Sequence, residues 1–93
     1  MFTIWKYPLE ITDKQIIHLP IGSMPLSVIG QGHDIYLYVR LNNRRQTEES
    51  QFEVYIHGTG HQIDEEEAFN SSFMGTVILL DGKLIFHVFI RRL

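Results

Sequence analysis

Short runs of alternating apolar and polar residues, separated by turn residues, dominate this chain of 93 residues. A period of two places every second side chain on the same face of an extended strand, and the runs are rich in β-branched and aromatic residues. The acidic stretch Asp64–Asn70 is the one candidate for a helical turn, with Asp64 as its N-cap, and a solvated loop is an equal alternative. The pattern predicts an all-β protein, a small antiparallel β-sandwich or partly open barrel of about seven strands, namely Phe2–Tyr7, Gln15–Leu19, Leu26–Ile29, Asp34–Leu41, Gln51–His57, Phe73–Leu80 and Lys83–Arg91.

Length and composition limit the class of protein. A chain of this length holds one modest core, so a single domain is expected over residues 1–93. The formal net charge of -3 gives no general basic field, which argues against non-specific binding to nucleic acid. The sequence contains no cysteine, which excludes disulfides and thiolate zinc sites and fits a reducing cytoplasm. Neither a signal peptide nor an apolar run of membrane-spanning length is found, so we expect a cytoplasmic protein without a membrane partner.

The fourth and fifth predicted strands have matching alternation, which predicts a hairpin in which Val39 pairs with Val54. This register buries the apolar side chains of both strands on one face. The opposite face then carries three cross-strand pairs: Arg40 beside Glu53, Tyr38 beside Tyr55, and Tyr36 beside His57. Aromatic residues and an arginine in one row are typical of a recognition surface, and an ordinary solvent-exposed face is an equal alternative.

A second hairpin is predicted at Asp81-Gly82, a pair typical of a two-residue type I′ turn. The turn pairs Leu80 with Lys83 and makes both faces of the hairpin apolar. One face is expected in the core and the other in a partner sheet or a subunit interface, which predicts a homo-oligomer. The same register makes His87 face Thr76 as a satisfied interior histidine. The two predicted faces are Val77, Leu79, Leu84, Phe86 and Val88 on one side, and Met74, Ile78, Ile85 and Phe89 on the other.

Between these hairpins lies the segment His57-Gly58-Thr59-Gly60-His61. Its glycines permit positive φ angles and close approach of backbone N–H groups to a bound group, and its histidines can donate, accept or ligate. A small anion is a candidate ligand, with charge neutralised by the histidines and by Arg40, Arg44 or Arg45. The alternative is a structural turn in which the glycines serve only the backbone geometry.

Signatures of catalysis and of metal binding are missing from the sequence. His57 and His61 are four residues apart, but a strand followed by a turn does not place them on one helix face as in zinc proteases. No serine lies in a Gly-x-Ser-x-Gly frame, and the glycine turn has neither the lysine of a P-loop nor the spacing of a dinucleotide fingerprint. We therefore expect a protein that is not an enzyme, with no catalytic residue, no metal and no cofactor.

Three segments resemble a family of short, uncharacterised phage and prophage proteins: Thr3–Leu9, the turn region Tyr55–Ile63 with its Gly-Thr-Gly-His element, and the ending represented by Phe73–Thr76 and Leu84–Phe89. The resemblance covers nearly the whole chain and brings no activity with it. It implies a phage-encoded accessory protein made in a bacterial cytoplasm.

Two functional hypotheses follow from these observations. In the first, an oligomer sequesters a small anionic nucleotide-type signal as a counter-defence protein. The ligand would stack on aromatic residues, Trp5 among them, and be held by the glycine turn and the arginines. In the second, the tyrosine face and the acids Asp64–Glu67 block a host defence protein. A metal-dependent hydrolase using His57 and His61 is a minority alternative. The predicted ligand-binding residues are Tyr36, Tyr38, Arg40, Arg44, Arg45, Tyr55, His57, Gly58, Thr59, Gly60 and His61.

Overall fold

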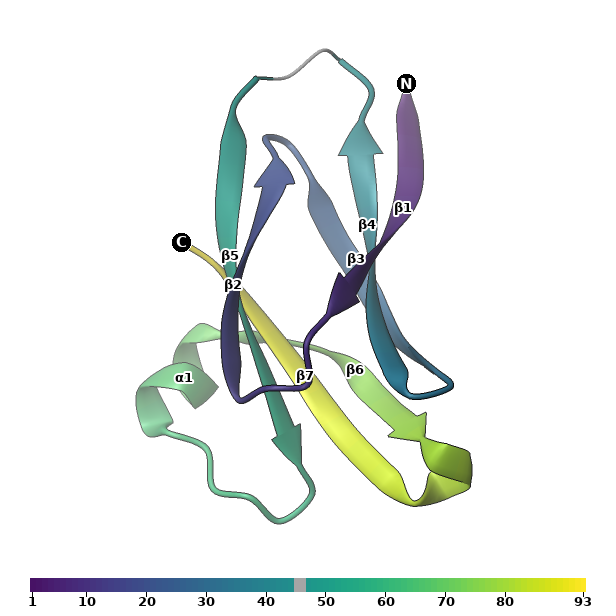
Figure 1. Cartoon of the computed structure of the whole chain (residues 1–93). Helices are drawn as coiled ribbons and strands as arrows, with labels where there is room; N and C mark the ends of the chain where they lie inside the picture. Colours follow the sequence, from purple (N-terminus) through teal and green to yellow (C-terminus); the bar gives the residue numbers. More distant parts are fainter. Residues whose placement is uncertain (45–46) are drawn as a thin grey trace.

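Seven strands and one short α-helix form the computed structural model, which describes residues 1–44 and 47–93 (Figure 1). This confirms the prediction of an all-β protein with seven strands. The helix α1 (Glu65–Asn70) lies within the predicted acidic stretch, although the Asp64 side chain makes no capping hydrogen bond. The strands are β1 (Phe2–Leu9), β2 (Lys14–Pro20), β3 (Met24–Gln31), β4 (Asp34–Asn42), β5 (Glu49–Gly58), β6 (Ser72–Leu79) and β7 (Leu84–Arg92), with a 3-10 turn η1 (Leu80–Gly82) before the last.

Two antiparallel sheets make up the sandwich. Sheet A has the strand order β1-β4-β3, and sheet B has the order β2-β5-β7-β6 (Figure 1). The sheets come closest where β3 meets β6: a Cβ atom added to Gly30 would lie 2.8 Å from Leu79 Cδ2 and 2.9 Å from the carbonyl oxygen of Ile78. The assembly is not a closed barrel, and in the parts described no helix is long and apolar enough to cross a membrane.

The core lies between the two sheets and follows the period-two pattern. In sheet A the central strand β4 contributes Ile35, Leu37 and Val39, which are fully buried. Sheet B contributes its alternate side chains in the same way, because every second residue of a strand faces the opposite layer. The buried apolar side chains are Leu9, Leu19, Ile35, Leu37, Val39, Phe52, Val54, Ile56, Val77, Leu79, Val88 and Ile90.

The predicted hairpin of the fourth and fifth strands is wrong. Strand β4 pairs with β1 and β3, so that Val39 lies opposite Trp5 and Pro25, whereas β5 pairs with β2 and β7 in the other sheet. Val39 and Val54 are both buried, but they face the core from different layers. Alternation specifies which face of a strand is buried, and the inner faces of both sheets of a sandwich satisfy it equally.

The C-terminal hairpin has the predicted register. Asp81 and Gly82 have φ angles of 55° and 90°, and the amide of Lys83 donates to the carbonyl oxygen of Leu80 at 3.1 Å, as a type I′ turn requires. Two details differ. Met74 packs against the core instead of facing outward, because a register shift between Phe73 and Gly75 interrupts the alternation of β6. Leu84, predicted to face the core, is 40% exposed beside the turn.

Candidate functional site

The glycine turn, residues 57–61, begins with the last two residues of β5. It is closed by a hydrogen bond from the amide of His61 to the carbonyl oxygen of Gly58, at 3.2 Å. Gly60 has a φ of 87°, a value that L side chains rarely adopt. A Cβ atom at Gly58 would lie 3.0 Å from Cε1 of His61, so the histidine ring covers this glycine. Each glycine therefore has a structural reason to be there, one for the backbone angle and one for the ring of His61.

His87 connects this turn to the C-terminal hairpin. Its Nε2 atom lies 2.8 Å from Thr59 Oγ1, and its Nδ1 atom lies 2.9 Å from Thr76 Oγ1. The predicted pairing of His87 with Thr76 is confirmed, but the ring is half-buried on the outer face of sheet B instead of in the interior. Because both ring nitrogens are engaged, His87 fixes the position of the turn relative to β6 and β7.

Next to the turn is an open cleft of about 370 Å³. The glycine turn forms one side, and the start of β7 forms the other. Among the described residues, His61 and Lys83 are the lining side chains that can carry positive charge, and none of those residues contributes a carboxylate to the cleft. Cationic groups beside an apolar wall suit a small anion that also carries an apolar or aromatic part. The cleft is lined by Gly58, Thr59, His61, Lys83, Leu84, Ile85 and Phe86.

His57 belongs to a different environment, although it begins the same motif. Its Nε2 atom lies 2.5 Å from Oε2 of Glu67 in α1, and its side chain is only 11% exposed. The ring of Phe89 lies 6.4 Å away, centroid to centroid, and is tilted against the imidazole. His57 therefore holds α1 against the outer face of sheet B. Its Nε2 atom is occupied by Glu67 and is not available to a ligand.

Beneath α1 lies a buried network of charged residues centred on Glu53, which sequence analysis missed. Its carboxylate accepts a hydrogen bond from the Tyr55 hydroxyl, lies 3.2 Å from Lys14 Nζ, and accepts hydrogen bonds from Arg91 Nη2 and Nε at 2.8 and 3.0 Å. Arg91 also approaches Glu66 at 3.9 Å. The pairing of Glu53 with Arg91 follows from the register of β5 with β7, whereas the predicted β4–β5 hairpin placed Arg40 beside Glu53.

The pKa shifts in this network show that it favours an ionised Glu53 and a neutral Tyr55. The hydrogen bond from Tyr55 holds the pKa of the Glu53 carboxyl below its ordinary value; burial opposes this shift, and Lys14 and Arg91 reinforce it. Burial, and then the hydrogen bond to Glu53, raises the pKa of Tyr55 to about 12. At neutral pH the carboxyl is ionised and the phenol is protonated, so neither group is suited to exchange a proton there.

A hollow of about 250 Å³ opens beside this network. It contains the carboxylates of Asp64, Glu66 and Glu67 together with the basic groups of Lys14 and Arg91. The density of carboxylates disfavours an anion, in contrast to the cleft at the glycine turn.

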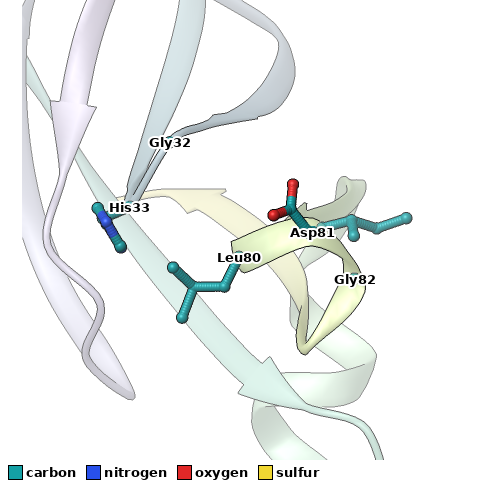
Figure 2. A pocket seen from close by; sticks show the side chains of 6 residues that line it. Gly32, His33, Leu80, Asp81 and Gly82 are labelled. Carbon is teal, nitrogen blue, oxygen red and sulfur yellow. The ribbon is translucent and has the colours of Figure 1, made fainter.

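Another hollow, of about 400 Å³, lies between the β3–β4 turn and the β6–β7 turn (Figure 2). His33 and Asp81 line it, but Figure 2 shows the Leu80 side chain between them, so they do not form an acid–base pair. Leu80, the residue before the two central residues of the turn, also has a positive φ, of 52°. This hollow is a groove between two turns.

A model of the family described as a domain of unknown function (DUF7352) matches residues 1–93. The chain belongs to this family. No similar protein was found among the curated proteins or among the solved structures. Membership of DUF7352 confirms the resemblance to an uncharacterised family over the whole chain.

In this DUF7352 chain the predicted ligand-binding residues do not form one site. Tyr36, Tyr38 and Arg40 lie on the outer face of sheet A, where they alternate with the buried residues of β4. Tyr55 lies on the outer face of sheet B, next to Glu53. The proposed cross-strand row of tyrosines is therefore divided between opposite sheets, which corrects the prediction based on the β4–β5 hairpin.

The remaining predicted residues are also separated. Arg44 is exposed after β4, where its amide bonds to Asn42 Oδ1 at 3.1 Å, and Arg45 lies outside the described residues. Trp5 belongs to β1 and is 60% exposed. Over residues 1–44 and 47–93, no group of three or more histidine, cysteine, aspartate or glutamate side chains could hold a metal ion. Of the predicted residues that the structure describes, Gly58, Thr59 and His61 alone line the cleft, and Lys83 joins them.

Proposed function

We propose that this DUF7352 protein is a non-catalytic binding protein that sequesters a small anionic molecule of nucleotide type in the cleft beside the glycine turn. The observation that carries the proposal is the combination of His61 and Lys83 with an apolar wall and, in the described part of the chain, no lining carboxylate. Lys83 supplies a mobile ammonium group for a phosphate, and Phe86 with Ile85 supplies apolar surface for a base. The cleft volume of about 370 Å³ lies in the range of small-molecule sites.

The proposed setting is the cytoplasm of a bacterium infected by a phage. The sequence resemblance to short phage and prophage proteins supports a phage-encoded product, and sequestration of a nucleotide signal would make it a counter-defence protein. The absence of any catalytic signature in the sequence supports binding without turnover.

The alternative of a host-protein inhibitor that acts through its acidic stretch has less support. Two of its four acids already have partners within the chain, since Glu67 bonds to His57 and Glu66 approaches Arg91. Only Asp64 and Glu65 then remain for a basic partner, which is a small charge for mimicry of a nucleic acid.

Native mass spectrometry of the protein purified from bacteria, followed by denaturation, tests the main proposal. We expect a retained molecule of nucleotide mass, which titration calorimetry with AMP, ADP-ribose and a cyclic dinucleotide would then classify. Lys83→Gln and His61→Gln should each weaken binding by about tenfold or more, since a hydrogen bond to a charged group contributes about 1.5–3 kcal/mol.

Lys6→Gln on sheet A is the matched control and should leave the affinity unchanged. The proposal fails if neither purified protein nor titrated probe shows binding. It also fails if Lys6→Gln weakens binding as much as Lys83→Gln, because the ligand would then occupy the other sheet.

A further inference from the structure

The outer face of sheet A is apolar and uncovered. Four apolar side chains from its two edge strands point outward and are between 40% and 63% exposed: Phe2, Ile4, Met24 and Ile29. No helix lies on this face in Figure 1, where α1 lies beside the strands of sheet B. An exposed apolar patch of this kind, rimmed by polar groups, is typical of a surface that binds another protein.

The same face carries positive charge. Lys6 lies over the ring of Tyr36, with its Nζ atom 4.4 Å from the centroid, and the guanidinium of Arg40 lies 4.9 Å from the ring centroid of Phe2. The Nε atom of Arg40 is buried and has no hydrogen-bond partner among the described residues. Buried donors are nearly always paired, so this guanidinium is suited to an acceptor other than the described residues of its own chain.

Helix α1 offers the complementary chemistry. Its inner side is fixed by Glu67, which bonds to His57, so Glu65 and Phe69, which are four residues apart, share the opposite side, and Glu66 lies between the two sides, toward Arg91. Phe69 is 82% exposed, an unusual position for so large an apolar side chain, and the Glu66 side chain is 75% exposed. The outward side of α1 is therefore an aromatic ring flanked by carboxylates.

We propose that the outer face of sheet A of one copy binds the outward side of α1 of a second copy. Phe69 of the second copy would pack among Phe2, Ile4 and Met24, while Glu65 would accept from Arg40. The two surfaces belong to opposite sheets, so a chain cannot satisfy its own. The contact is heterologous and extends head to tail into a ring or an open chain. This inference does not depend on the ligand cleft, since no lining residue of that cleft takes part.

Sedimentation velocity of the full chain over a concentration series tests the assembly. We expect species larger than a monomer for the wild type, and monomers for Ile4→Asp and for Phe69→Ser at the same concentrations. An equimolar mixture of these two variants should form a dimer and nothing larger, because each still has one intact surface. Arg40→Glu and Glu65→Lys should each weaken association at least tenfold, and the double variant should recover it.

Ile78→Ser is the matched control, because Ile78 is 59% exposed on the outer face of sheet B and takes no part in the proposed contact. Circular dichroism confirms that each variant folds. A wild type that stays monomeric throughout the series overturns the proposal. So does a mixture of Ile4→Asp and Phe69→Ser that forms no dimer, or an assembly that only Ile78→Ser disrupts, which would place the contact on the β6–β7 hairpin.

Discussion

The Nε2 atom of His57 lies 2.5 Å from the Oε2 atom of Glu67, ten positions later, so the end of strand β5 is joined directly to helix α1. A helix of six residues has little stability of its own. This contact, with the approach of Arg91 to Glu66, keeps α1 over the buried Glu53 network. His57, one of the two histidines predicted to bind a ligand, is thus a structural anchor for α1.

Replacing Glu67 by glutamine should loosen α1. The substitution removes the charged partner of a histidine that is only 11% exposed, and we expect the free energy of unfolding to fall by about 1–2 kcal/mol. Chemical denaturation measures the loss, and hydrogen exchange should show faster exchange of the α1 amides. Glu65→Gln, on the exposed side of the same helix, is the control and should stay within about 0.5 kcal/mol of the wild type. Equal effects of the two substitutions would contradict the anchoring role of Glu67.

The sequence predicts the local features of this fold well and its strand pairing poorly. Period-two alternation is a local property, and it placed all seven strands and the core-facing side chains of β4 and β5 correctly. The Asp81-Gly82 turn is also local, since two positive φ angles in succession need residues of this type. Which strands become neighbours is a non-local property, and the prediction that β4 pairs with β5 was wrong.

The candidate site shows the same division. Gly58, Thr59 and His61 were identified from the turn itself, whereas Lys83 reaches the cleft because β7 pairs with β5, with Phe86 opposite Gly58. The network around Glu53 joins residues 38 positions apart. The sequence indicated only that Glu53, Tyr55 and His57 share one face of β5. Nothing in the sequence showed that α1 would cover that face.

Acid should destabilise the protein through Glu53. Its pKa is lower in the folded state than in the unfolded chain, so its contribution to stability is present above the unfolded pKa of about 4.3 and is lost as the pH falls through the folded pKa. Glu53→Gln should cost about 2 kcal/mol at pH 7, because Lys14 and Arg91 lose their shared partner.

Denaturation midpoints between pH 7 and pH 3 measure this effect. The difference in stability between wild type and Glu53→Gln should narrow as the pH falls from the unfolded pKa of about 4.3 toward the lower folded pKa, because the wild-type carboxyl then gains a proton. Glu48→Gln, an exposed position before β5, should keep the wild-type profile. A difference that stays constant over the whole range would show that the ionised carboxylate contributes nothing.

Alkaline pH should destabilise the protein through Tyr55, whose pKa is shifted upward on folding, in contrast to that of Glu53. Burial and the bond to Glu53 raise its pKa to about 12, above the value of about 10 in an unfolded chain. The stability it contributes is therefore complete below pH 10 and is lost as the pH rises from about 10 to 12. Tyr55→Phe should lose less stability over this interval than the wild type, measured by urea denaturation. Tyr38→Phe on sheet A is the control; a profile of Tyr55→Phe as steep as that of Tyr38→Phe would contradict the assignment.

Gly30 marks the point where the two sheets approach most closely, and alanine at this position should force them apart. The added methyl group would lie 2.8 Å from Leu79 Cδ2 and 2.9 Å from the carbonyl oxygen of Ile78, and the second of these atoms cannot move without shifting β6. Overpacking of this kind costs about 2–3 kcal/mol. Gly32→Ala separates the steric effect from the loss of glycine itself, because Gly32 has a φ of 64° but no atom within 4 Å of the added Cβ, so only backbone strain of about 1 kcal/mol is expected. Thermal and urea denaturation of both variants measure the difference. If Gly32→Ala proved as destabilising as Gly30→Ala, the contact between β3 and β6 would not be the close junction on which the sandwich depends.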